Sequence, residues 1–150
     1  MSARLFITAA LVVASVCSSL AGQRESKGAR TERLTAIVSR IHAIGKSGYT
    51  DAKFPLVSRE IDPVSDVQDL RSLALIFYGV LSPQMGDESY DFAFEAAMFR
   101  CVRKLAEIPG RDASRALEDL RLTIGRDGGP ALELREAIEK QARISKRATP

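Results

Sequence analysis

Apolar residues recur along the first half of this chain at the spacing of an α-helix. Within residues 29–44 they fall at i, i+3, i+4, i+7 and i+10, which places them on one face of a helix. These residues are Leu34, Ile37, Val38, Ile41 and Ile44. Gly45 follows them as a stop signal. We therefore predict an amphipathic helix over residues 29–44.

Two further helices are predicted to be central. Asp62 and Pro63 form a helix-start signal, because a capping carboxylate precedes a residue preferred at the first helical position. Apolar residues then cover most of the circumference of this helix up to its end at about Leu81, as expected of a buried helix. Asp87 is expected to cap the next helix over residues 88–107, which also has two apolar faces.

Two more helices complete the pattern. Asp112 is expected to cap a helix whose apolar stripe is Ala113, Ala116, Leu117, Leu120 and Ile124. Pro130 is expected to open the last helix, with Leu132, Ile138 and Ala142 facing inward and Leu134 on the flank. Residues 145–150 form a basic tail that is expected to be loose. No segment alternates at period two, so we predict no sheet.

The stretch VRKLAEIPGRDASRALEDL, residues 102–120, resembles a HEAT-type helical repeat. In that family a first helix ending in Leu, Ala, Ile and Gly is followed by a second helix with Ala and Leu facing it. From residue 88 to residue 130 the chain advances about 42 residues, within the ~40–47 residues of such repeats. The resemblance implies a short solenoid, whereas an irregular bundle fits the same stripes. We predict an all-α domain over residues 31–144, with about five helices stacked as antiparallel hairpins.

Residues 46–61 show no clean period and form an unusually long connection for a compact helical domain. Such a segment is commonly functional or contains a short turn of helix. Its aromatic side chains either dock under the core or take part in a binding loop. For the binding loop, the candidate contact residues are Tyr49, Lys53, Phe54 and Arg59.

The first residues have the form of an export signal. Arg4 precedes the apolar stretch Leu5–Val16, which is shorter than the ~20 residues that a membrane-spanning helix needs. We expect cleavage after Ala21, because small residues then occupy the positions that signal peptidase reads. This cleavage would leave a flexible segment over residues 22–30 and an exported, periplasmic or secreted protein without an integral membrane segment. The alternatives are acylation of Cys17 and an uncleaved anchor.

Charge and chemistry narrow the function further. The net charge is +3, but the two signs are interleaved and form no basic stripe, so we expect no nucleic-acid partner. His42 is the only histidine and lies beside an apolar stripe. After loss of the leader Cys101 is the only cysteine, and it lies on an apolar stripe as a buried hydrophobe would. One histidine and one such cysteine fall short of a zinc site, and we expect no metal or cofactor.

Carboxylates offer the one remaining route to catalysis. Asp87, Asp91 and Glu95 share a helix face, where first-turn acids usually act in capping. We therefore assign no catalytic residue and expect a non-catalytic module whose partner is another protein. The alternatives are a cell-envelope hydrolase or lyase that uses these carboxylates, and a ligand carrier or sensor. The carrier would have an apolar pocket lined by Phe77, Phe94 and Phe99.

Overall fold

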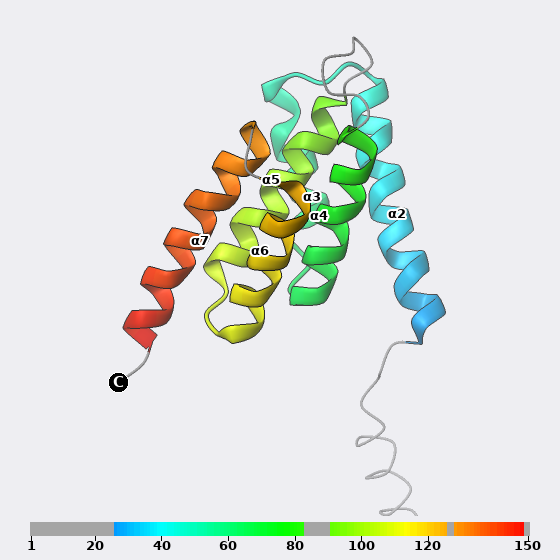
Figure 1. Ribbon diagram of the computed structural model, residues 1–150. Coiled ribbons are helices and arrows are strands. Elements are labelled where there is room, and N and C mark those ends of the chain that lie inside the picture. The colour runs from blue at the N-terminus through cyan, green and yellow to red at the C-terminus, as the bar shows by residue number, and fades with distance from the viewer. Residues whose placement is uncertain (1–25, 83–90, 126–127, 149–150) are drawn as a thin grey trace, which may run out of the picture. The chain divides into compact units, whose positions relative to one another are not determined.

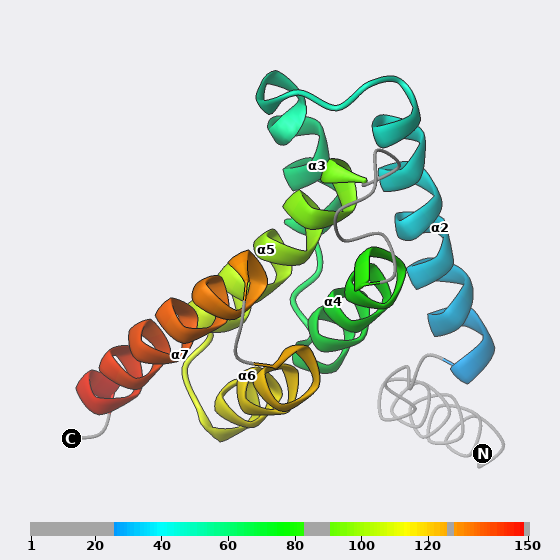
Figure 2. The ribbon, with the colours of Figure 1, turned by 45° about the horizontal axis from the view of Figure 1, so that its top comes forward.

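The computed structural model describes residues 26–82, 91–125 and 128–148, and these residues contain helices and no strand (Figures 1 and 2). The α-helices are α2 (Lys27–Lys46), α3 (Phe54–Ile61), α4 (Val67–Leu81), α5 (Phe92–Glu107), α6 (Arg111–Ile124) and α7 (Gly129–Ala148). A short 3-10 helix, η1 (Asp51–Lys53), precedes α3. The predicted all-α class is therefore confirmed, with six α-helices in the described residues rather than about five. The predicted leader and its cleavage site lie outside these residues.

The chain divides into two units, residues 1–32 and 33–150, and the helix packing and the hollows described below concern the second unit. The colour order in Figure 1 shows that α4, α5, α6 and α7 run in alternating directions. Helices α4 and α5 pack together, α6 packs on both, and α7 packs on α5 and α6. Helix α3 packs on α5. The arrangement is a set of antiparallel helices around one core.

The core consists of the predicted apolar stripes. Fully buried residues come from each of the helices α2 to α7, among them Ile41, Ile61, Phe77, Leu105, Leu117 and Leu134. Burying a side chain of this size contributes about 1.5–3 kcal/mol. The α6 stripe is buried as predicted, from Ala113 to Ile124. Cys101 is also completely buried in this core.

The segment 46–61, which has no clean apolar period, contains η1 and the two-turn helix α3. The expectation of a short turn of helix in this segment is therefore confirmed. Pro55 lies in the first turn of α3, where a missing N–H group has no cost, and Val57 and Ile61 are completely buried. Two buried residues one turn apart anchor this helix but are too few to establish a helical period.

Several predicted helix boundaries were wrong, and the capping contacts give the reason. Asp62 lies at the carboxyl end of α3, and α4 begins at Val67 because Asp66 caps it through a bond from the N–H of Asp69 (2.9 Å). Asp91 caps α5, whereas Asp87 lies outside the described residues. Gly110 occupies the N-cap position of α6 without a side-chain bond, so Asp112 falls in the first turn.

The last helix is rotated relative to the prediction. Leu132 is 49% exposed, whereas Leu134 is 1% exposed and belongs to the core. The inward face follows Leu134, Ala137 and Gln141, and Ala142 is exposed. Helix α7 also continues through residues 145–148, which were expected to be loose. At the other end of the chain, α2 begins at Lys27, inside the segment 22–30 that was expected to be irregular.

Candidate functional site

A hollow of about 540 Å3 lies between the η1–α3 segment and α5. Four aromatic side chains line it together with two carboxylates and one arginine. They are Tyr49, Phe54, Phe92, Phe99, Asp51, Glu95 and Arg103. We call this hollow the aromatic groove. Phe92 is 57% exposed and the other three aromatic residues are half-buried, so ring surface is available to a ligand.

Helix α3 is fastened to its neighbours by charged contacts on the side of its carboxyl end. Arg100 of α5 donates from Nε to Asp62 (2.6 Å), and the Lys104 ammonium donates to the carbonyl of Asp62. Arg40 of α2 donates to Glu60 (2.5 Å). These contacts join the carboxyl end of α3 to α5 and α2, while Phe54, the first residue of α3, lines the groove. Helix α3, which forms one wall of the groove, is therefore joined to both α5 and α2.

The four predicted contact residues occupy different places. Tyr49 and Phe54 line the aromatic groove. Lys53 donates from Nζ to the carbonyl and the hydroxyl of Ser47, both at 2.8 Å, and so closes the turn that precedes η1. Arg59 is exposed on α3 and is not among the residues that line the groove.

Sequence reasoning missed Phe92 and Phe99 as members of this site. They come from α5, far along the chain from Tyr49 and Phe54. Their own spacing of two helical turns places both on one face of α5, and that was the available signal. Phe92 is one of the apolar residues of the helix predicted over residues 88–107, which was expected to be central, so its exposure was not anticipated.

The charged side chains that line the groove are Asp51, Glu95 and Arg103. Burial raises the pKa of the Tyr49 hydroxyl, and the negative charges of Asp51 and Glu95 raise it further. The one cation in the lining, Arg103, is held by Glu133 of α7 through two hydrogen bonds of 2.6 and 3.1 Å. These bonds also raise the pKa of Arg103. Arg103 is thus paired with Glu133, and the carboxylates that line the groove are those of Asp51 and Glu95.

His42 has a carboxylate partner that the sequence did not reveal. Its Nδ1 lies 3.4 Å from Oδ2 of Asp91, a residue 49 positions away, and its ring packs against Phe94 at 5.6 Å between centroids. His42 itself is 48% exposed. The other carboxylate oxygen of Asp91 accepts from the N–H groups of Ala93 (3.0 Å) and Phe94 (3.3 Å). Asp91 thus caps α5 and links it to α2.

Gly45 makes this link possible. It lies inside α2 rather than after its end, and a β-carbon at this position would lie 2.5 Å from Oδ1 and 2.9 Å from Oδ2 of Asp91. Glycine is therefore required by the close approach of the Asp91 carboxylate. The left-handed backbone that follows α2 belongs to Gly48, with φ of 77°.

Phe77, Phe94 and Phe99, which the alternative ligand carrier would place around one apolar pocket, lie in different places in the described residues. Phe77 and Phe94 are buried and pack on each other with ring centroids 5.3 Å apart. Phe99 lies elsewhere, in the lining of the aromatic groove. Two of the three rings therefore belong to the buried core, and the third belongs to the groove.

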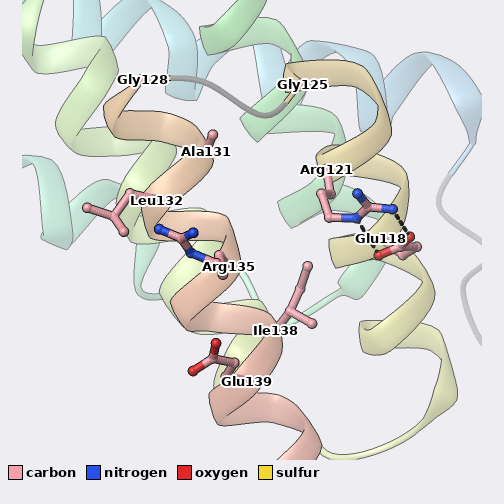
Figure 3. A pocket seen from close by; sticks show the side chains of 9 residues that line it. All are labelled: Glu118, Arg121, Gly125, Gly128, Ala131, Leu132, Arg135, Ile138 and Glu139. Carbon is pink, nitrogen blue, oxygen red and sulfur yellow. Dashed lines mark hydrogen bonds and ion pairs between the residues drawn. The ribbon is translucent and has the colours of Figure 1, made fainter.

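A second hollow, of about 570 Å3, lies between α6 and α7 (Figure 3). Figure 3 shows the Ile138 side chain pointing into the gap between the two helices, with Arg121 and Glu118 on the α6 side. Arg121 donates from Nε to Glu118 (2.9 Å). The remaining charged residues of the lining are Arg135 and Glu139. The lining therefore contains two positive and two negative side chains.

Within residues 26–82, 91–125 and 128–148, no three histidine, cysteine or carboxylate side chains form a group that could hold a metal ion. No helix of the described part of the chain has both the length and the apolarity needed to cross a bilayer. Comparison of the chain with protein families, with curated proteins and with solved structures gives no match.

Proposed function

We propose that this protein is exported and acts as a non-catalytic module that binds another protein through the aromatic groove. The observation that carries the proposal is the gathering of Tyr49, Phe54, Phe92 and Phe99 from two separate segments around one open hollow. Aromatic residues are enriched in protein interfaces and provide much of their binding energy. An exposed ring such as Phe92 is a natural anchor for a partner.

Export is supported by residues 1–21 alone. The apolar stretch Leu5–Val16, one preceding charge and the small residue Ala21 are typical of a cleaved leader. N-terminal sequencing of the protein recovered outside the cytoplasm should begin at Gly22. A lipid-modified Cys17 or an intact leader would contradict cleavage after Ala21.

The HEAT-like interpretation is part of the same proposal. Antiparallel helices α5 and α6, joined by the turn at Gly110 with φ of 115°, support a relation to such hairpins. In solenoid proteins the stacked hairpins present surfaces on which partners dock. The aromatic groove would be the docking surface of this short stack.

Carboxylate catalysis has less support than binding. The Asp91 carboxylate accepts hydrogen bonds from two backbone N–H groups and lies next to His42. These contacts explain the position of Asp91 without a catalytic role. Glu95 lines the aromatic groove, where its charge also serves recognition. The positions of Asp91 and Glu95 are therefore better explained by helix capping and binding than by hydrolysis.

Position-specific photo-crosslinking tests the binding proposal. The photo-reactive residue p-benzoylphenylalanine replaces Phe92 in cells that export the protein, and Leu122, which is 69% exposed and lines neither hollow, is the matched control position. We expect a discrete protein adduct from position 92 that is lost on Phe54→Ala and absent from position 122. No adduct from position 92, or the same adducts from both positions, would contradict the proposal.

A further inference from the structure

Five exposed cations lie at one end of the α6–α7 pair, although the two charge signs are interleaved along the sequence. Arg111 and Arg115 belong to the first turns of α6, and Arg143, Lys146 and Arg147 belong to the last turns of α7. All five side chains are exposed. In the described residues none of them forms an ion pair. We call these five residues the basic end.

A buried glutamine joins the two helices at the basic end. The Gln141 side chain of α7, which is 3% exposed, accepts from the hydroxyl of Ser114 (2.7 Å) and donates from Nε2 to the carbonyl of Gly110 (3.1 Å). The last turns of α7 therefore lie next to the start of α6, and Figures 1 and 2 show the two on the same side of the helices. The fold thus brings the five cations together.

Nearby carboxylates do not cancel the charge of the basic end. Asp112 and Glu139 each lie one helical turn from one of its arginines, but no ion pair joins them to it in the part of the chain that the structure describes. If both acids are set against the five cations, three positive charges remain. The other carboxylates close to these turns are paired with different cations. Those pairs are Lys140 with Glu107, Arg121 with Glu118, and Arg71 with Asp119.

Helix stability does not explain this gathering of cations. Arg111 lies in the first turn of α6, where the helix dipole disfavours a positive charge. Arg115 follows Arg111 by four residues, and like charges at this spacing destabilise a helix. Arg143 and Arg147 repeat the spacing on α7. Only the last turn of α7, with Lys146 and Arg147, is a place where the dipole favours cations. An anion outside the protein accounts for the whole set.

The basic end has the chemistry of a surface that lies on acidic lipid headgroups. None of its residues lines the aromatic groove or the hollow between α6 and α7, so its cations do not converge on one compact ligand. No large apolar side chain is exposed within residues 111–115 or 141–147, whereas the centre of a protein interface normally contains such side chains. Electrostatic attraction of lysine and arginine to acidic headgroups needs neither a pocket nor an apolar centre.

We propose that the basic end binds the acidic headgroups of a membrane surface. The choice of lipid over nucleic acid rests on export, which is part of the proposed function, because an exported protein meets lipid as its extended anionic surface. The basic end adjoins the carboxyl end of α5, whereas Phe92 is the first residue of that helix. A membrane at the basic end therefore leaves the aromatic groove accessible to the partner.

Co-sedimentation of the full exported chain with lipid vesicles tests the proposal. One set of vesicles contains phosphatidylglycerol and phosphatidylcholine in equal parts, and the other contains phosphatidylcholine alone. We expect binding to the acidic vesicles only, and weaker binding as the salt concentration rises. The combined variant Arg143→Gln, Lys146→Gln and Arg147→Gln should bind about 100-fold more weakly, since each cation near an acidic surface contributes about five-fold.

A matched variant separates the position of the cations from the net charge. Lys46→Gln, Arg59→Gln and Arg135→Gln together remove three other exposed cations that form no ion pair within residues 26–82, 91–125 and 128–148. This variant has the same net charge as the first and should retain most of the binding. If either triple variant does not fold, the comparison of acidic and neutral vesicles on the unaltered protein still decides.

Four results would overturn the proposal. They are no binding to the acidic vesicles, equal loss in the two triple variants, loss of vesicle binding in Phe92→Ala, and tighter binding to a short DNA duplex or to polyglutamate that depends on the same three α7 cations. Such a failure leaves the proposed function standing, because export is tested by N-terminal sequencing and the groove by crosslinking from position 92. Failure of those two experiments contradicts the proposed function whatever the vesicles show.

Discussion

Replacing Gly45 by alanine tests how α2 is joined to α5. Alanine in place of glycine in a helix normally stabilises a protein by about 0.5–1 kcal/mol, because it restricts the unfolded chain. Here the new methyl group would lie 2.5 Å from Oδ1 and 2.9 Å from Oδ2 of Asp91. That carboxylate cannot move without giving up its bonds to the N–H groups of Ala93 and Phe94.

The expected magnitude follows from the groups that are displaced. Losing an N-cap costs about 1 kcal/mol and at most about 2 kcal/mol. The exposed contact between His42 and Asp91 adds between about zero and 1 kcal/mol. These losses offset or exceed the gain in helix propensity. We expect Gly45→Ala to leave the free energy of unfolding unchanged or to lower it by up to about 2.5 kcal/mol.

Gly79 provides the matched control, because it lies within α4 and a β-carbon there would meet no atom within 4 Å. Gly79→Ala should therefore raise the free energy of unfolding by about 0.5–1 kcal/mol. Urea unfolding followed by circular dichroism measures both variants. In an Asp91→Ala background, Gly45→Ala should become stabilising, since the obstructing carboxylate is gone. A Gly45→Ala variant that is stabilised as much as Gly79→Ala in the unaltered background would refute the reasoning.

Further predictions concern a thiol and two helix starts. Burial raises the pKa of Cys101 in the folded protein, so above about pH 8.5 only the unfolded thiol ionises and stability falls as pH rises. Urea unfolding between pH 7 and 10 should show the unaltered protein losing up to about 1.4 kcal/mol per pH unit relative to Cys101→Ala, and parallel curves would contradict the burial of this thiol. Asp66→Ala should lower the free energy of unfolding by about 1 kcal/mol, because its side chain caps α4. Asp112→Ala should lower it by only about 0.3 kcal/mol, since Asp112 contributes a first-turn charge and Gly110 holds the cap position; equal effects of the two variants would show that the caps are wrongly assigned.

The long helices could be predicted from the sequence because each repeats its apolar stripe over several turns. The α6 stripe from Ala113 to Ile124 is the clearest case. Helix α3 could not, since two turns leave only Val57 and Ile61 to mark its buried face. Helix starts were ambiguous for a related reason. Asp62 and Asp66 are both suitable caps in sequence, and contacts from α5 to Asp62 decide between them.

The candidate site was predicted in part. Tyr49 and Phe54 lie close together along the chain, so an aromatic segment was evident from the sequence. Their joining with Phe92 and Phe99 depends on the packing of α3 on α5, which no local pattern encodes. The pairing of His42 with a distant carboxylate was missed for the same reason, because only residues one turn away on the same helix could be judged as partners.

The central claim is that the aromatic groove, rather than the hollow between α6 and α7, receives the partner. Amide chemical shifts of the full exported chain, titrated with the partner protein identified by crosslinking from position 92, test it most directly. The account predicts that the largest shifts fall in residues 49–54 and 92–103. Shifts concentrated instead in residues 118–125 and 128–139 would contradict it.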